Sequence, residues 1–180
     1  MEHHSPQSNS HPHLHARVIP STRTGRYPSE GSSMEIITPG PITASRVPDE
    51  LRAGFWSRHI GTAPQWYALE HHIQDTMTRM SPGYRPGYWH YRTLSNGGIF
   101  IQPDAAEDTQ WPVCNTLIGR DARLSSPAAG MTVSLMTYAL QAYQTGSDVL
   151  IGHYHRLRAF IVQHPDAQDI LSLIDTGPTT

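Results

Sequence analysis

Histidines are the residues of this chain best suited to binding a metal, and two pairs of them stand in segments expected to be helical. His71 and His72 are adjacent, so their side chains point about 100° apart on a helix. His153 and His155 are two positions apart and also diverge. Neither pair has the i, i+4 spacing that lets two imidazoles on one helix share a zinc ion. The spacing predicts no metal site, and we expect no cofactor.

Nucleophiles and paired carboxylates, the other groups that could do chemistry, are sparse. Cys114 is the only cysteine, which excludes an internal disulfide, and its apolar neighbours indicate a small core residue. Glu107 and Asp108 form the one close acidic pair of the middle of the chain, in an expected loop. No G-x-S-x-G, phosphate-binding loop or dinucleotide motif is present. We therefore expect no catalytic residues and no enzyme; a hydrolase built on Cys114 is the weakest alternative.

The best candidate for a binding surface lies in an aromatic strand. Alternate residues of a strand point to opposite faces, so Trp89 and Tyr91 separate from Tyr88, His90 and Arg92. One set is expected in the core, and the other forms an exposed row that could contact a partner or stack on bases. We call Tyr88, His90 and Arg92 the polar row.

Helical patterns dominate the segments around this strand. Apolar residues recur at helical spacing, with capping residues at the ends, and predict two long helices over 64–80 and 126–145. Ser126 is the expected N-cap of the second, Pro127 suits its first turn, and Gly146 closes it. Shorter helices are expected over three further segments: 47–61, 148–163 and the region around 170–174.

Strand signals are confined to the middle of the chain. Residues 88–94 and 98–102 are rich in aromatic and β-branched types, and Asn96 and Gly97 between them favour a type I′ hairpin turn, with Gly98 beside it. Residues 111–119 are a candidate third strand. The fold class predicted is α+β: a small antiparallel sheet, made of the hairpin plus a third strand, packed with about four to five helices.

Composition limits the partners and the compartment. The 180 residues carry 13 cationic and 15 acidic side chains, a net charge of -2, so neither strong DNA binding nor DNA mimicry is indicated. No apolar run is long enough for a membrane span, and a single cysteine fits a reducing cytoplasm. Residues 1–41, rich in Pro, His and Ser, are expected to be a disordered tail. One domain over 42–176 and a short tail over 177–180 complete the predicted organisation.

Four motifs resemble one known family. "ITASRVPDELRAGFWSRHIG", "GYWHYRTLSNGGIFIQP", "LSSPAAGMTVSLMTYAL" and "HYHRLRAFIVQHPDAQDILSLID" occur in the order and at the spacing typical of ArdB/KlcA-type antirestriction proteins. The resemblance implies a plasmid or other mobile-element protein that protects incoming DNA from host type I restriction-modification systems. It implies no enzymatic activity, and a partner that is the restriction complex or an associated host factor. A non-enzymatic nucleic-acid-binding accessory protein, using the polar row and the tail arginines, is the alternative.

The resemblance also adds residues to the candidate interaction surface. The family's "HPEA" keeps its acidic residue here as Asp166, and its closing "ID" is retained with Asp175. The family's aspartate at the start of the second long helix is replaced by Pro127. The candidate surface therefore comprises the polar row together with Asp166 and Asp175.

Overall fold

The structure is a computed structural model, and it describes residues 40–175. Within this range the chain forms five α-helices and two small antiparallel sheets, which confirms the α+β class. The expected tails lie almost entirely in residues 1–39 and 176–180, outside the described residues, as do the tail arginines. None of the helices in residues 40–175 is long and apolar enough to cross a membrane.

The first part of the described chain is a strand followed by short helices. Strand β1 spans Ala44–Arg46. The single helix expected over 47–61 is instead a 3₁₀ turn, η1 (Asp49–Gly54), that continues into α1 (Phe55–Ile60). A second 3₁₀ turn, η2 (Trp66–Ala68), leads into α2 (Leu69–Met80), whose predicted apolar stripe is buried from Leu69 to Met80.

The hairpin forms one sheet with β1. Strand β2 (Trp89–Leu94) pairs antiparallel with β3 (Ile99–Pro103) and, on its other side, with β1. The turn has one positive φ, at Gly97 (81°), and none at Asn96, so the type I′ prediction is wrong. The amide of Gly97 donates to Leu94 O and the amide of Leu94 to Gly98 O, which makes a three-residue turn with glycine in the left-handed position.

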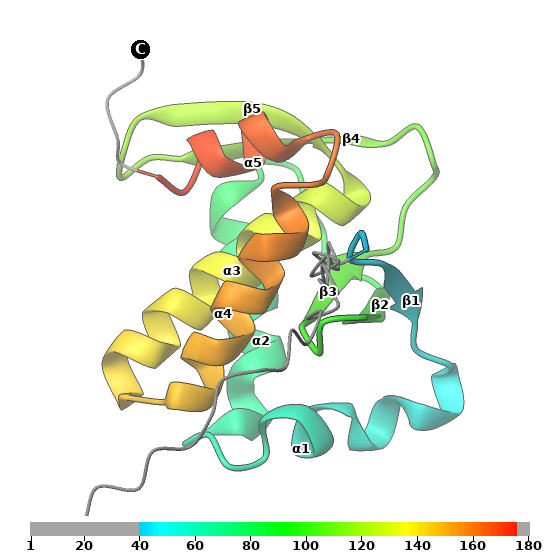
Figure 1. Cartoon of the computed structure of the whole chain (residues 1–180). Coiled ribbons are helices and arrows are strands. Elements are labelled where there is room, and N and C mark those ends of the chain that lie inside the picture. Colours follow the sequence, from blue (N-terminus) through cyan, green and yellow to red (C-terminus); the bar gives the residue numbers. More distant parts are fainter. Residues whose placement is uncertain (1–39, 176–180) are drawn as a thin grey trace, which may run out of the picture. The chain divides into compact units, whose positions relative to one another are not determined.

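The second sheet corrects the predicted strand pairing. Residues 110–115 do form a strand, β4 (Gln110–Asn115), but its partner is β5 (Arg120–Ser125) and not the hairpin. The third strand of the hairpin sheet is β1, which the sequence pattern did not reveal. Figure 1 shows β4 and β5 together at one end of the α3–α4 helix pair, where β5 runs directly into α3.

Helix α3 (Ser126–Thr145) is the centre of the fold. Its N-cap is Ser125, one residue before the expected Ser126, and the Ser125 hydroxyl accepts a hydrogen bond from Ala128 N. Gly146 ends it in the left-handed conformation, as predicted. Buried residues surround most of the helix because β3, α2 and α4 all pack on it.

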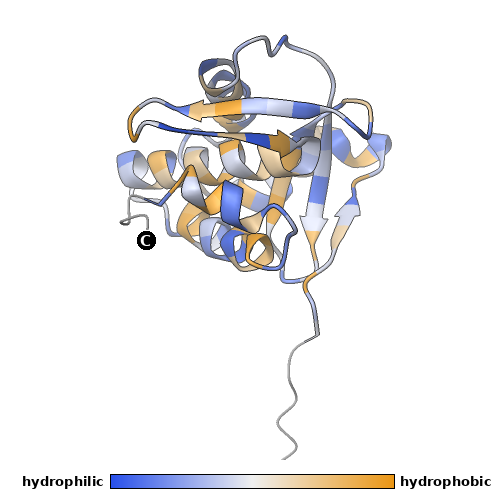
Figure 2. Ribbon diagram, turned by 90° about the horizontal axis from the view of Figure 1, so that it is seen from above, coloured by the Kyte–Doolittle hydropathy of each residue, from blue (hydrophilic) through white to orange (hydrophobic). Residues whose placement is uncertain are grey.

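Helices α4 (Asp148–Ile161) and α5 (Ala167–Ser172) complete the chain. Helix α4 returns beside α3 (Figure 1) and buries Leu150, Leu157 and Ile161, with Tyr154 half-buried. It also buries His153. In Figure 2 the β4–β5 pair crosses in front of helices that carry many apolar residues.

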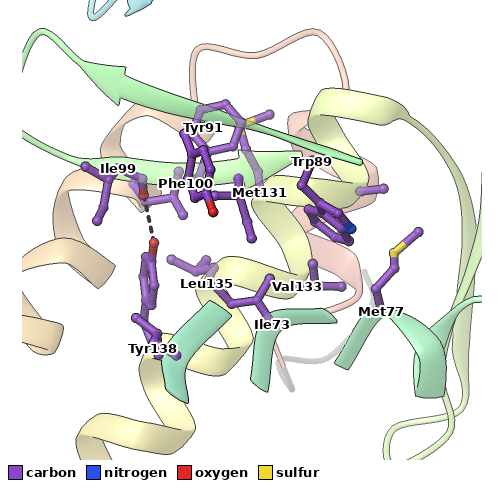
Figure 3. Packing of buried hydrophobic residues seen from close by; sticks show 14 of the residues in the cluster. Ile73, Met77, Trp89, Tyr91, Ile99, Phe100, Met131, Val133, Leu135 and Tyr138 are labelled. Atoms are coloured by element: carbon purple, nitrogen blue, oxygen red, sulfur yellow. Dashed lines mark hydrogen bonds between the residues drawn. The ribbon is translucent and has the colours of Figure 1, made fainter. Parts of the chain in front are cut away.

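The core lies between the hairpin sheet and the helices. Figure 3 shows side chains of α2, α3 and the hairpin meeting in one cluster. The hydroxyl of Tyr138 on α3 donates to Ile99 O across 3.1 Å, which satisfies the one polar atom of a fully buried ring. The core faces of β2 and β3 are therefore occupied, and the opposite face of β2 is left for other contacts.

Candidate interaction surface

His90 and Arg92 lie on the face of β2 opposite Trp89 and Tyr91, as alternation predicted, and Tyr88, the residue before the strand, packs against His90 with ring centroids 5.2 Å apart. Trp89 and Tyr91 are buried, with 1% and 5% of their surface exposed, whereas Tyr88 is 44% exposed. His90 and Arg92 are half-buried. The spacing rule thus places the three side chains on one face, although only Tyr88 is freely accessible.

Arg52 of η1 packs on Tyr88, the first residue of the row, and sequence reasoning missed this contact. Its guanidinium carbon lies 4.1 Å from the ring centroid of Tyr88 and 4.4 Å from that of Tyr91. One Nη atom of Arg52 also donates to Trp89 O across 2.8 Å. Such stacking on two rings immobilises the arginine and connects η1 to β2. Because 37 residues separate Arg52 from Trp89, no local spacing could indicate the contact.

Asp49, three residues earlier, joins the outer edge of this group. The Tyr88 hydroxyl donates to Asp49 Oδ1 across 2.7 Å, and this hydrogen bond lowers the pKa of the Asp49 carboxyl below its usual value. Arg46 on β1 lies 3.8 Å from the same oxygen. The exposed edge of the surface therefore presents an aromatic ring beside a carboxylate and a guanidinium.

His90 is paired with a carboxylate from the end of β3. Its Nε2 lies 2.7 Å from Asp104 Oδ1, while its Nδ1 is buried and has no hydrogen-bond partner among the described residues. A histidine–aspartate pair could support general base chemistry if a nucleophile stood at the free nitrogen. No such hydroxyl or thiol bonds to His90 in residues 40–175. The contact that the structure does show, with Asp104, orients the imidazole ring of His90.

Arg92 is likewise engaged within the sheet. Its Nε donates to Gln102 Oε1 across 3.1 Å, and Arg46 is its cross-strand neighbour. Burial, followed by repulsion from Arg46, lowers the pKa of the Arg92 guanidinium. The row and its neighbours therefore form an ordered surface of mixed charge, in which each charged side chain has a partner or a close neighbour.

The two carboxylates added by the resemblance bind elsewhere in the fold. Asp166 accepts a hydrogen bond from the Ser125 hydroxyl across 2.7 Å and stands at the start of α5. Asp175 forms a two-point ion pair with Arg158, with N–O distances of 2.8 and 3.1 Å. The hydrogen bonds and ion pairs of both carboxylates thus join them to other elements and not to the polar row.

The remaining chemical candidates stay apart. Within residues 40–175 no three His, Cys, Asp or Glu side chains gather as metal ligands would. Glu107 and Asp108 are exposed in the loop before β4, as expected. Cys114 is half-buried on β4 and lines a hollow that contains no histidine.

Comparison with known proteins finds one matching family model and several relatives that are similar over most of the chain. A family model described as antirestriction protein matches residues 82–175. YafX, an uncharacterized protein of Escherichia coli K12, is 45% identical over 134 residues, which cover 74% of this chain and 88% of YafX. An antirestriction protein KlcA of Escherichia coli is 34% identical, over 75% of this chain and 96% of KlcA.

A solved structure from work on the KlcA and ArdB proteins has the same fold. It superposes with a TM-score of 0.67 at 32% identity, over 76% of this chain and 96% of the other. That work describes a novel fold and antirestriction activity against type I DNA restriction systems in vivo but not in vitro. The residues that the family model matches, 82–175, include the hairpin, α3 and α4.

Proposed function

This chain belongs to the antirestriction protein family, and on that premise we propose that it protects incoming mobile-element DNA from type I restriction-modification systems of its host. The observation that carries the proposal is the match to KlcA over nearly the whole length of that relative. The shared fold with the KlcA and ArdB proteins supports it independently of any single motif. The site of action on this proposal is the cytoplasm, where restriction enzymes meet entering DNA.

The proposed mode of action is contact between proteins and not imitation of DNA. A DNA mimic competes for a phosphate-binding channel and needs a dense excess of carboxylates. Here 15 acidic side chains face 13 cationic ones, and carboxylates such as Asp49, Asp104 and Asp175 lie against arginine or histidine. Such paired charge produces little field at a distance.

The partner on this proposal is the restriction complex or a host factor associated with it. Activity of the KlcA and ArdB proteins in vivo but not in vitro is the behaviour expected if a cellular component is needed. We extend that reading to this chain and favour the host factor.

The polar row supplies the proposed contact. Tyr88 offers an exposed ring fixed by Arg52 on one side and bonded to Asp49 at its hydroxyl. Rigid aromatic side chains lose little conformational entropy on binding and are enriched at contact hot spots. Asp166 and Asp175, the other residues of the candidate surface, bond to Ser125 and Arg158, so the proposal assigns the contact to the polar row and not to them.

Binding to nucleic acid is the second candidate, and the contacts favour it less. A nucleic-acid surface needs cations free to reach phosphates. Arg92 bonds to Gln102 and Arg52 is stacked between two rings, so neither is poised for that role. Catalysis is not part of the proposal, since His90 has a carboxylate partner but no nucleophile bonded to it in residues 40–175.

Plating of unmodified phage tests the proposal. The full chain is expressed in a host with an active type I system and in a matched host that lacks the nuclease. Expression should raise plating efficiency only in the first host. Unchanged plating, with the protein present in the soluble fraction at a level that lets KlcA protect, would overturn the proposal. A shift of DNA mobility that weakens with salt would instead support the nucleic-acid alternative.

A further inference from the structure

Helix α3 leaves one apolar stripe without a partner. Met136, Leu140 and Tyr143 follow one another at i, i+4 and i+7, so they lie on one side of the helix. Met136 is half-buried, but Leu140 is 46% exposed and Tyr143 is 90% exposed. The rest of α3 is among the most buried parts of the fold, so this exposure is confined to its C-terminal half. Clustered exposed apolar side chains are characteristic of contact sites.

A hollow of about 350 Å³ lies on one side of this stripe. Its walls come from α2, α3 and the turn between β4 and β5, and include Met80, Met136, Leu140 and Leu117. Leu117 is the exposed apolar tip of that turn, with 89% of its surface accessible. The hollow is therefore open and mostly apolar, and it extends the stripe toward the second sheet.

A smaller hollow of about 230 Å³ lies on the other side, between α3 and α4. Its walls include Tyr143, Ile151, Tyr154 and His155. Ile151 is 41% exposed. We call the two hollows, together with the stripe of α3 that contributes a wall to each, the α3 surface; its residues come from α2, α3, α4 and the turn between β4 and β5.

Among the residues that line the two hollows, Arg79 is the one with a formal charge at pH 7. Neither hollow is lined by a carboxylate, and the ionisable bases are Arg79 and His155. The Arg79 guanidinium donates to Thr76 Oγ1 across 2.9 Å and makes no ion pair with the other described residues. A chain with 15 acidic and 13 cationic side chains thus presents a site whose formal charge, with histidine neutral, is the single positive charge of Arg79.

We propose that the α3 surface is the docking site for an acidic amphipathic segment of a partner protein. Apolar side chains of that segment enter the two hollows on either side of Leu140 and Tyr143, and one of its carboxylates pairs with Arg79. Recognition of an amphipathic segment by an apolar groove with a charged rim is a recurring mode of protein contact. This inference rests on the proposed function, because it assigns the segment to the restriction complex or its host factor.

The chemistry argues against the other occupants. The stripe and hollows are apolar, whereas a nucleic acid would need several free cations beside its phosphates. A second copy of this chain would bring another Arg79 and His155 unless an acidic region faced the site. The acidic segment is the occupant that satisfies both the apolar walls and the cationic rim.

The first test changes the surface in cells that carry the type I system. In the full chain, Leu140→Glu and Leu117→Glu place a carboxylate where the proposal puts an acidic partner, so protection should fall by about tenfold or more. Arg79→Glu should lower protection to the same extent, and Arg79→Lys should give protection between that of Arg79→Glu and that of the parent chain. Val162→Glu and Tyr67→Glu are matched controls, because they alter exposed residues (58% and 73%) elsewhere and should protect like the parent chain. Thermal unfolding midpoints must match the parent.

The second test identifies the occupant. A photo-crosslinking residue at Tyr143, and at Tyr67 as the control, is activated in the same cells, and the crosslinked peptides are sequenced. The proposal expects that the probe at Tyr143, but not the probe at Tyr67, crosslinks to an acidic and apolar segment of one protein. Leu140→Glu should abolish this crosslink. Full protection by the Glu variants overturns the inference, as does crosslinking to DNA, to a second copy or to a segment without carboxylates. If the parent chain gives no protection, the proposed function is overturned instead. The crosslinking result by itself then decides whether the α3 surface binds an acidic segment.

Discussion

The hydroxyl of Ser125 donates to the carboxylate of Asp166 across 2.7 Å, which joins the start of α3 to the start of α5. Ser125 also caps α3 by accepting from Ala128 N at 3.4 Å. A carboxylate beside this helix end is favourable, because the N-terminus carries partial positive charge. The first turn of α3 holds Pro127 and no acidic residue, and Asp166 places negative charge at the same end from another part of the chain.

Loss of this carboxylate should lower stability. We expect Asp166→Ala to reduce the free energy of unfolding by about 1–2 kcal/mol, because a charge-assisted hydrogen bond and the favourable dipole interaction disappear together. Asp166→Asn should cost about half as much, since the amide oxygen still accepts a hydrogen bond. Urea unfolding measures both, with the exposed Asp169→Ala as control. If Asp166→Ala unfolds like the parent but no longer protects, Asp166 is a contact residue and not a support.

Gly130 is a second point where the fold allows little change. A Cβ at this position would lie 2.3 Å from Ile101 O and 2.6 Å from Gln102 Cα, both in the backbone of β3. Backbone atoms cannot rotate away as a flexible side chain can. The absence of a side chain therefore allows α3 to approach the sheet.

We expect Gly130→Ala to destabilise the domain by about 3 kcal/mol or more, since the helix must move from the sheet that it packs on. Gly152→Ala on α4 is the matched control: its Cβ would meet only the mobile end of Arg156, at 3.3 Å. That change should be neutral or stabilise by about 0.5–1 kcal/mol through helix propensity. Thermal unfolding followed by circular dichroism compares the two, and equal midpoints would contradict the close approach.

Glu70 joins three elements beneath the polar row. Its Oε2 accepts hydrogen bonds from Trp56 Nε1 on α1 at 2.9 Å and from the Tyr91 hydroxyl on β2 at 2.6 Å. Glu70→Ala leaves both donors unpaired and should cost about 2–4 kcal/mol, whereas Tyr91→Phe should cost about 1 kcal/mol. The exposed Glu50→Ala should stay within about 0.5 kcal/mol of the parent.

The Tyr91 phenol gives this network a spectroscopic signal. Burial, and next the bond to Glu70, raises the pKa of Tyr91 to about 12. Ultraviolet titration of the parent against Tyr91→Phe should therefore assign one phenolate transition near that pH. In Glu70→Gln the negative neighbour is gone, so the transition should move to lower pH. An unshifted transition would show that Glu70 does not act on the phenol.

The buried histidine of α4, His153, should make the stability of the domain depend on pH. His153 is 4% exposed, its Nε2 lies 3.1 Å from His59 O, and its Nδ1 has no partner among the described residues. Burial lowers the pKa of His153, with Arg156 and His59 as nearby bases, and burial also lowers the pKa of His59. The unfolded chain then binds protons first as the pH falls.

Stability should therefore be complete above the unfolded histidine pKa of about 6.5 and decline below it. Urea unfolding between about pH 7.5 and about pH 5.5 measures the slope, in a window above the titration of ordinary carboxyls. His153→Gln should flatten this slope, because it removes the buried imidazole. A parent slope that His153→Gln leaves unaltered would assign the effect to other groups.

Local patterns predicted the helices well and the sheets only in part. The stripe from Leu69 to Met80 is visible because α2 buries one face, and that burial imposes a helical period. Strand β1 is three exposed residues, and β5 buries Leu124 alone, so neither leaves a period to detect. The pairing of β4 with β5 instead of the hairpin depends on how distant segments assemble, which no spacing within β4 records.

The candidate site follows the same division. Alternation placed Tyr88, His90 and Arg92 on one face because that rule is local. Their bonds to Asp49, Asp104 and Gln102 join elements that meet only in the folded chain. Arg52 was missed for this reason, since its contacts with the rings are tertiary.

Substitution of Tyr88 tests whether the polar row is a contact. Its ring is fixed between Arg52 and solvent, and its hydroxyl bonds to the exposed Asp49. If a partner packs on the ring, Tyr88→Ala should lower protection in the plating assay by about tenfold or more, as loss of an aromatic hot spot does. Tyr88→Phe keeps the ring but loses the hydroxyl, so its protection should lie between that of Tyr88→Ala and that of the parent chain. Tyr67→Ala removes an even more exposed ring, from η2, and serves as the control.

Stability separates a contact from a support in this experiment. Removal of the Tyr88 ring also removes one of the two ring contacts of Arg52, so a small loss of unfolding free energy, about 0.5–1 kcal/mol, accompanies Tyr88→Ala in either case. Arg52→Ala loses the same stacking, together with the bond to Trp89 O, but leaves the Tyr88 ring exposed. If protection follows the ring, Tyr88→Ala is the more damaging change for activity although Arg52→Ala is the more damaging one for stability. The reverse order for activity would make the row a structural clamp and leave partner contact to other surfaces.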